Sequence, residues 1–281
     1  MRCDSHVHIV GPPDRYPQVS TRTYLAGVAT LDELRRRGAE RGVTRFVIVQ
    51  PSFYGTDNSV LLESLETLGA DGRGVAVVDP AMALPETLAD LANRGVRGLR
   101  FNLYSTPAGR VAQRVDVAFA ALARLAQAIE GHVEVIAPIK VLVDNAEVFA
   151  QSPAPVVIDH YGVYGRSTPE SAEGRGLLDL IRRPHVWIKL SAPYRVSDDP
   201  LATRPDQAWL AALVAAAPDR CVWGSDWPHT PPHEAHKGAD IALPFRELSY
   251  ATVVDHFLAA LPSAELADRI MRDNPARLYG F

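Results

Sequence analysis

The sequence has few cysteines and no long apolar run. Its two cysteines, Cys3 and Cys221, are too few for a disulfide scaffold, and no cysteine pair has the spacing of a zinc motif. We expect both to be buried thiols in a reducing compartment. The longest apolar run, residues 209–217, is less than half of the roughly 20 residues that a membrane span needs. The N-terminus lacks an apolar signal region, so the expected location is the cytoplasm, with no membrane partner.

An excess of positive charge is also missing. Lysine and arginine number 29 against 33 acidic residues, which gives a net charge of −4. Binding to nucleic acid needs a concentrated basic face, so this balance argues against such a partner. With 47% hydrophobic and 22% charged residues, the composition is typical of a globular protein and excludes the disordered and collagen-like classes.

Short β-rich runs alternate with helical patterns along the chain, as in βαβ units with a parallel sheet. Eight such units in 281 residues favour an α/β protein with a single-domain (β/α)8 TIM barrel over residues 1–281. A doubly wound open sheet is the alternative. Residues 228–244 form a long irregular segment after the last strand, which we expect to be functional, as a flap over the site. The expected strands cover residues 3–9, 45–50, 74–78, 98–102, 133–137, 156–159, 186–190 and 221–224, and the expected helices cover 31–41, 59–68, 85–94, 117–130, 173–182 and 207–216.

Candidate catalytic residues lie at the carboxyl ends of these strands, which is where the active site of a TIM barrel is found. The first strand carries His6 and His8, whose spacing of two puts both rings on one face. His160 ends the sixth strand, and Asp226 follows the eighth. Each has an ordinary structural explanation when taken singly, such as a core histidine or a turn aspartate. Together, at the strand ends of one barrel, they predict an active site.

These residues lie in motifs that resemble the amidohydrolase superfamily, in its amidohydrolase 2 branch, and within that branch the lactone hydrolases that act on compounds such as 2-pyrone-4,6-dicarboxylate. The resemblance covers nearly the whole chain. It implies a distorted (β/α)8 barrel and hydrolysis in which Asp226 is the general base on water. The motifs are H-V-H at 6–8, Q-P-S-F-Y-G-T-D-N at 50–58, R-G-L-R-F-N at 97–102, I-D-H at 158–160, W-G-S-D-W-P-H at 223–229 and D-N-P-A-R-L-Y-G at 273–280.

The sequence departs from the binuclear members of the superfamily. Those members have a bridging carboxylated lysine at the end of the fourth strand and a histidine at the end of the fifth. Here the two ends read R-F-N at 100–102 and V-I-A at 135–137, and His132 falls at the start of the expected fifth strand. At most a mononuclear metal site remains, and the ligands of that site would be His6, His8, His160 and Asp226. The lactonases that the chain resembles are thought to work without a metal.

Two arginines, Arg100 and Arg195, are expected on the rim of the barrel. Guanidinium groups are suited to bidentate capture of carboxylates, which indicates a small anionic substrate, with a dicarboxylate favoured. They would also repel a metal cation in the same cavity. A reaction that requires no cofactor is therefore favoured, with a single divalent metal such as zinc as the alternative. Ser52, Tyr54 and Tyr194 are expected as auxiliary donors to the substrate.

The predicted function is hydrolysis of the lactone ring of an anionic substrate, such as 2-pyrone-4,6-dicarboxylate, in aromatic degradation. His6, His8 and His160 would stabilise the developing oxyanion, or ligate zinc if it is bound. The alternatives are a sugar-lactone hydrolase or isomerase, a zinc-dependent decarboxylase of the same superfamily, and a binding barrel without catalysis. The oligomeric state is not predicted. Further residues whose contact with the substrate stays open are Arg110, Tyr161, Arg166 and His229.

Overall fold

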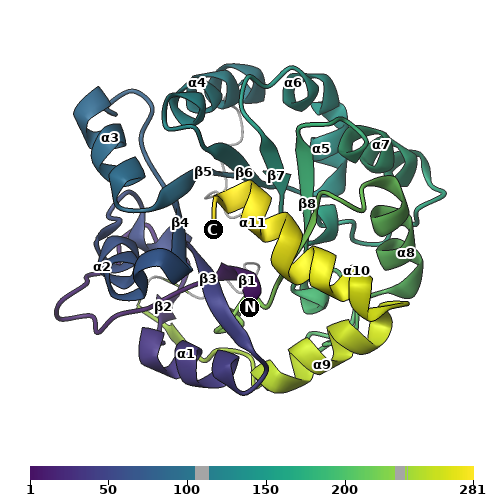
Figure 1. Ribbon diagram of the computed structural model, residues 1–281. Helices are drawn as coiled ribbons and strands as arrows, with labels where there is room; N and C mark the ends of the chain where they lie inside the picture. The colour runs from purple at the N-terminus through teal and green to yellow at the C-terminus, as the bar shows by residue number, and fades with distance from the viewer. Residues whose placement is uncertain (105–113, 232–237, 239) are drawn as a thin grey trace.

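Eight parallel strands occupy the centre of the computed structural model, which describes residues 1–104, 114–231, 238 and 240–281 (Figure 1). Each strand pairs with the next one along the sheet, in chain order. All eight strands were predicted, with ends that differ by a few residues. They are β1 (Arg2–Val7), β3 (Val43–Val49), β4 (Gly72–Ala76), β5 (Val96–Asn102), β6 (His132–Ile136), β7 (Val156–Ile158), β8 (Val186–Ser191) and β9 (Cys221–Gly224).

The sheet closes into a barrel just beyond the end of β9. Val7 forms a parallel bridge with Trp227, and the backbone N–H of His8 donates to the carbonyl of Trp227 at 2.7 Å. Gly224 permits this close approach, because a Cβ at that position would lie only 2.6 Å from the Cβ of His6. The closure confirms the (β/α)8 barrel and excludes the open sheet.

Helices follow the strands and surround the barrel, while the C-terminal segment crosses the end of the barrel where the strands begin (Figure 1). Several helices begin at the capping residues that the sequence offers: the side chain of Thr30 accepts a hydrogen bond from the N–H of Glu33, and that of Asp206 from the N–H of Trp209. The helices are α1 (Leu31–Ala39), α2 (Ser59–Leu68), α3 (Pro85–Asn93), α4 (Val115–Ala128), α5 (Ile139–Asp144), α6 (Ala146–Ala150), α7 (Ala172–Ile181), α8 (Gln207–Ala216), α9 (Tyr250–Ala260), α10 (Ala264–Asp268) and α11 (Asn274–Tyr279).

Two short strands outside the barrel were not predicted. β2 (Leu25–Ala26) pairs in parallel with β10 (Ala242–Leu243). The predicted flap at 228–244 lies only in part within the described residues, and the part that is described includes β10. No helix in the described ranges is long and apolar enough to cross a membrane.

The interior of the barrel changes from apolar to polar along its axis. At the end closed by α11, Cys3, Val47 and Tyr279 belong to one buried apolar cluster. Both cysteines are buried free thiols, as predicted. Toward the carboxyl ends of the strands, the buried side chains become titratable, with Glu134 on β6 and Lys189 on β8 fully enclosed. A barrel normally fills this space with branched apolar side chains, so the polar interior marks the functional end.

Candidate active site

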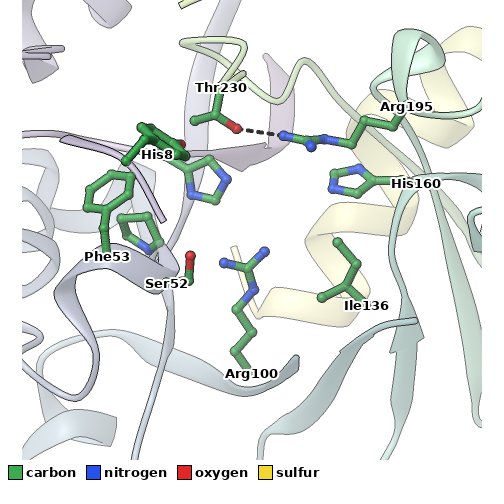
Figure 2. Close-up of a pocket in the computed structure, with 10 residues that line it drawn as sticks. His8, Ser52, Phe53, Arg100, Ile136, His160, Arg195 and Thr230 are labelled. Atoms are coloured by element: carbon green, nitrogen blue, oxygen red, sulfur yellow. Dashed lines mark hydrogen bonds between the residues drawn. The ribbon is translucent and has the colours of Figure 1, made fainter. Parts of the chain in front are cut away.

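A pocket opens among the carboxyl ends of the strands and collects residues that are distant in the sequence (Figure 2). Strand ends from different parts of the chain contribute side chains, as the barrel geometry predicts. Five of the predicted residues line the pocket directly, namely His8, Ser52, Arg100, His160 and Arg195. The full lining is His8, Tyr24, Pro51, Ser52, Phe53, Arg100, Ile136, His160, Arg195 and Thr230.

Asp226 lies beneath this pocket and faces both histidines of the H-x-H pair. Its Oδ1 is 3.5 Å from Nε2 of His6 and 3.3 Å from Nε2 of His8. The two imidazole rings meet edge to face, with centroids 5.0 Å apart. Asp226 and His160 both have left-handed backbones, with φ of 60° and 49°. A left-handed backbone is uncommon outside glycine, and such strain concentrates at functional sites.

The second oxygen of Asp226 is fixed by two donors. Arg195 Nε donates to Oδ2 at 2.7 Å, and the hydroxyl of Tyr194 donates to the same oxygen at 2.7 Å. Burial opposes ionisation of Asp226, but the charge of Arg195 and the nearby histidines hold its pKa well below the usual range. Oδ1 has no hydrogen-bond partner among the described residues. Asp226 is therefore an ionised carboxylate with one oxygen held and one available.

His8 is oriented by the backbone of the neighbouring strand. Its Nδ1 lies 2.7 Å from the carbonyl oxygen of Val49, which can only accept a hydrogen bond. Nδ1 therefore carries a proton, and the ring is held with Nε2 3.3 Å from Oδ1 of Asp226.

His160 begins the turn η3 (His160–Gly162) directly after β7, and its ring centroid lies 4.7 Å from that of His6. Nδ1 of His160 is hydrogen-bonded to Oγ of Ser191 at 2.8 Å. Burial lowers the pKa of His160 to about 4, and burial together with the charge of Lys189 holds the pKa of His6 well below its usual range. Both rings are therefore neutral at pH 7.

Arg100 enters the pocket from β5, and Figure 2 shows its guanidinium pointing into the space between Ser52 and His160. One terminal nitrogen donates to the carbonyl oxygen of Gln50 at 2.7 Å, whereas Nε has no hydrogen-bond partner among the described residues. No carboxylate in the described part of the chain forms an ion pair with Arg100. Its charge is therefore available to an anion in the pocket.

Some predicted residues lie in other places or other roles. The Tyr54 hydroxyl accepts a hydrogen bond from the backbone N–H of Gly11 at 3.1 Å and does not line the pocket. Tyr194 lies behind Asp226 rather than on the pocket wall. Arg195 lines the pocket, but it binds Asp226 and also donates to Oγ1 of Thr230 at 2.6 Å. Of the residues left open, His229 is buried beside Tyr194, and Arg110 lies outside the described residues.

Sequence reasoning missed two parts of the site. Tyr24 and Thr230 line the pocket from irregular segments, where no periodicity marks them. The buried group of Glu134, Asp159 and Lys189 lies directly below His6. Alternation along β8 could have revealed it, because Lys189 lies two residues before Ser191 and therefore on the same, inward face.

The sequence allows at most a single divalent metal ion, as the alternative to a reaction without a cofactor, and three donor atoms are arranged to suit one. His6, His8 and Asp226 are buried, and each offers one ligand atom within 4.8 Å of those of the other two. The contacts of 3.3 and 3.5 Å to Asp226 are close to the roughly 3.3 Å that separates ligands of a tetrahedral zinc. Nε2 of His6 and Oδ1 of Asp226 are also without hydrogen-bond partners among the described residues. By spacing, these residues suit a single divalent cation, provided that each histidine nitrogen has a lone pair to offer.

Comparison with known proteins places this site in a family. The model of the amidohydrolase family (Amidohydro_2) matches residues 3–281. The chain is 30% identical to a 4-sulfomuconolactone hydrolase of Hydrogenophaga intermedia over 280 residues, 99% of this chain and 88% of that protein. It is 31% identical to a 2-pyrone-4,6-dicarboxylate hydrolase of Comamonas testosteroni over 291 residues, 98% of this chain and 89% of that protein.

A solved structure is similar over the whole chain. It comes from Acinetobacter baumannii, is described as a probable 2-pyrone-4,6-dicarboxylic acid hydrolase and has citric acid bound. The TM-score is 0.84 at 25% identity, with coverage of 100% of this chain and 99% of that one. The family model and the relatives both span almost the full length, so the chain belongs to the amidohydrolase family.

Proposed function

We propose that the protein hydrolyses the lactone ring of a small anionic substrate, with Asp226 as the general base. The observation that carries this proposal is the asymmetry of the buried carboxylate: Oδ2 is held by Arg195 and Tyr194, while Oδ1 has no partner among the described residues and lies below the pocket. A general base needs an ionised group with a free lone pair within reach of the attacking water. The names of the two relatives described above support a lactone as the substrate.

In the proposed reaction, Oδ1 of Asp226 takes a proton from a water molecule as its oxygen bonds to the lactone carbonyl carbon. Negative charge develops on the carbonyl oxygen, and imidazole N–H groups of His6 and His160 stabilise it. The ring C–O bond then breaks, and the departing oxygen recovers the proton from Asp226. The products are a carboxylic acid and an alcohol or enol, and the enzyme returns to its starting state. If a divalent cation is bound by His6, His8 and Asp226, it polarises the carbonyl and acidifies the water.

The pocket wall supports an anionic substrate. Arg100 brings a guanidinium that no carboxylate of the described residues neutralises, and Ser52 adds a hydroxyl beside it. A carboxylate or sulfonate on the lactone would form a charge-assisted hydrogen bond with this group. We assign Arg100 to substrate recognition, and we assign Arg195 to holding the base because its Nε and Nη2 bind Asp226 and Thr230.

The experiment is a ring-opening assay on 2-pyrone-4,6-dicarboxylate, on 4-sulfomuconolactone and on a neutral lactone of similar size. Ultraviolet absorbance follows loss of the ring, and mass spectrometry identifies a product heavier by one water. The Asp226→Asn variant is compared with Asp32→Asn, which changes an exposed aspartate on α1. We expect turnover of an anionic lactone that falls at least about 100-fold in Asp226→Asn and is unchanged in Asp32→Asn. Equal rates in both variants, or no turnover of any lactone, would contradict the proposal.

A further inference from the structure

A lysine is enclosed inside the barrel directly beneath His6. Lys189 on β8 is fully buried and forms ion pairs with Glu134, which it contacts closely, and with Asp159 at 3.5 Å. Its Nζ also lies 3.2 Å from Nδ1 of His6. The two carboxylates compensate the burial of the ammonium group. The contact with His6 is the one that reaches the active site.

This contact decides which nitrogen of His6 carries the proton. A lysine ammonium has only hydrogens to offer, so Nδ1 of His6 must accept. A neutral imidazole has one N–H, and its proton then resides on Nε2. Nε2 is the nitrogen that faces Oδ1 of Asp226 at 3.5 Å. The ring therefore points an N–H, not a lone pair, toward the base.

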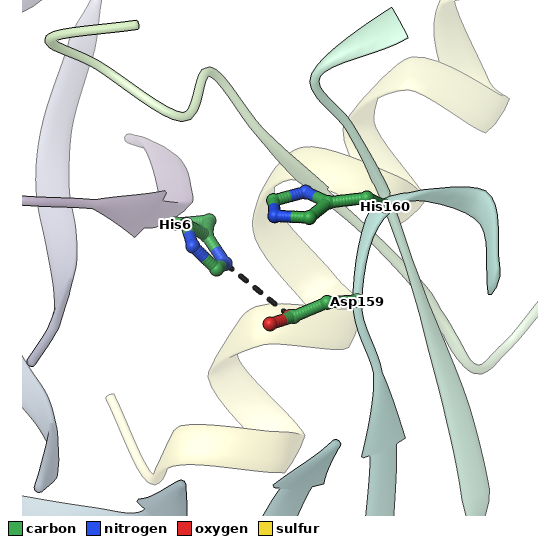
Figure 3. Close-up of side chains that lie close together, drawn as sticks. All are labelled: His6, Asp159 and His160. Carbon is green, nitrogen blue, oxygen red and sulfur yellow. Dashed lines mark ion pairs between the residues drawn. The ribbon is translucent and has the colours of Figure 1, made fainter. Parts of the chain in front are cut away.

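Asp159 competes with Lys189 for the same nitrogen. Figure 3 shows its carboxylate beside the His6 ring, with Oδ1 3.3 Å from Nδ1. Were Nδ1 to donate to Asp159, the lone pair would move to Nε2. The geometry favours the lysine, because Nζ of Lys189 forms a hydrogen bond with Nδ1 whereas neither carboxylate oxygen of Asp159 has a hydrogen-bond partner among the described residues.

We propose that Lys189 is a positioning residue that holds His6 as the tautomer protonated on Nε2, so that His6 acts as a hydrogen-bond donor and not as a metal ligand. A ligand nitrogen needs a lone pair, and an N–H cannot coordinate a cation. His8 is held differently, because its Nδ1 donates to the carbonyl oxygen of Val49. The catalytic consequence rests on the proposed lactone hydrolysis, whereas the tautomer does not.

The direct test is nitrogen NMR of the wild-type protein labelled with [15N]histidine. Chemical shifts and couplings to the ring hydrogens distinguish a protonated ring nitrogen from one with a lone pair, and a His6→Gln spectrum assigns the signals of His6. We expect the proton on Nε2 of His6 and on Nδ1 of His8. A proton on Nδ1 of His6 would overturn the proposal, whether or not the enzyme opens lactones.

A second test removes the lysine while keeping the charge balance. The double variant Lys189→Met/Glu134→Gln lacks the ammonium donor and one of its carboxylates, and Glu134→Gln alone is the matched control that retains Lys189. With the ammonium gone, Nδ1 of His6 is free to donate to Asp159, and Nε2 gains a lone pair. We expect the NMR pattern of His6 to invert, and zinc affinity measured by calorimetry to rise about 10- to 100-fold over the control.

An unchanged tautomer and unchanged zinc affinity in a folded double variant would overturn the proposal. Circular dichroism establishes folding, and if the double variant does not fold, the wild-type spectrum decides alone. Neither readout requires turnover, so failure of the lactonase assay is distinguishable from failure of this inference.

Discussion

Arg195 Nε lies 2.7 Å from Oδ2 of Asp226, and this contact directs the other oxygen of the carboxylate toward the pocket. The two residues come from segments that follow adjacent strands, Arg195 in the turn η4 (Pro193–Arg195) after β8 and Asp226 after β9. The pairing explains how a carboxylate in a fully buried position stays ionised. The pairing also distinguishes two arginines for which the sequence predicted the same role: both line the pocket, but only Arg195 forms an ion pair with Asp226.

Removing Arg195 is expected to shift the acid limb of the pH–rate profile. In the folded enzyme, burial opposes ionisation of Asp226 while Arg195 lowers its pKa, so loss of the guanidinium raises that pKa. The Arg195→Met variant should then lose its activity at a higher pH than wild type as the pH falls, with a lower kcat throughout. The pH dependence of kcat/KM checks this, with the exposed Arg272→Met as control. An acid limb at the same pH in wild type and Arg195→Met would count against the assignment.

Arg100 is expected to bind a negatively charged group of the substrate. Replacing it with methionine removes one charge-assisted hydrogen bond, which should raise KM about 10- to 100-fold for a dicarboxylate. A neutral lactone makes no such bond, and its KM should change little. Parallel KM measurements on the two substrates test the difference. A similar rise for both would mean that Arg100 shapes the pocket without recognising charge.

Tyr194 and Tyr54 form a matched pair, because both were expected to contact substrate and neither lines the pocket. The Tyr194 hydroxyl donates to Asp226, so Tyr194→Phe should lower kcat roughly tenfold with little change in KM. The Tyr54 hydroxyl accepts from Gly11, so Tyr54→Phe should cost about 1 kcal/mol of stability and leave kcat/KM unchanged. Steady-state kinetics and urea unfolding distinguish the roles of the two tyrosines. A raised KM in Tyr54→Phe would contradict the structural role and show that Tyr54 contacts the substrate.

Buried histidines are expected to make the fold sensitive to acid. Burial lowers the pKa of His160 and of His229 from 6.5 to about 4. Between these values the unfolded chain binds protons that the folded protein does not, so the free energy of unfolding falls as the pH drops from 6.5 to 4. Each group accounts for a decrease on the order of 3 kcal/mol. Asp226, whose pKa is lowered, adds to acid lability only below its ordinary value of 3.8.

Urea unfolding at several pH values measures this effect. The His229→Gln variant should show a shallower dependence on pH than wild type, because one titrating group is gone. Identical slopes in the two proteins would show that His229 does not resist protonation in the fold.

The barrel and its four central residues could be predicted because they follow regular patterns. Strand alternation places His6 and His8 on one face, and the rule for strand ends brings His160 and Asp226 to the same mouth. The hydrogen-bond and ion-pair partners of these residues could not be predicted. Whether Arg195 binds a substrate or the carboxylate of Asp226 depends on the backbone conformation of η4.

Irregular segments explain most of the remaining differences. Tyr24 precedes a strand of only two residues, too short to give a periodic signal. The Tyr54 hydroxyl contacts Gly11 and not the pocket, although Tyr54 lies in the same short turn, η1 (Ser52–Tyr54), as Ser52. The position of Lys189 could not be predicted for another reason. A lysine within a strand normally faces solvent, and ion pairs with Glu134 and Asp159 offset the free-energy cost of burying its ammonium group.

The most direct test of the account is turnover of 2-pyrone-4,6-dicarboxylate by protein treated with a chelator, with residual metal measured by mass spectrometry on the same sample. If Asp226 activates water with the help of histidine N–H groups, turnover persists at a metal content far below one ion per chain, and the equally treated Asp226→Asn protein is inactive. Activity that disappears with the metal and returns on addition of one equivalent of zinc would contradict the account.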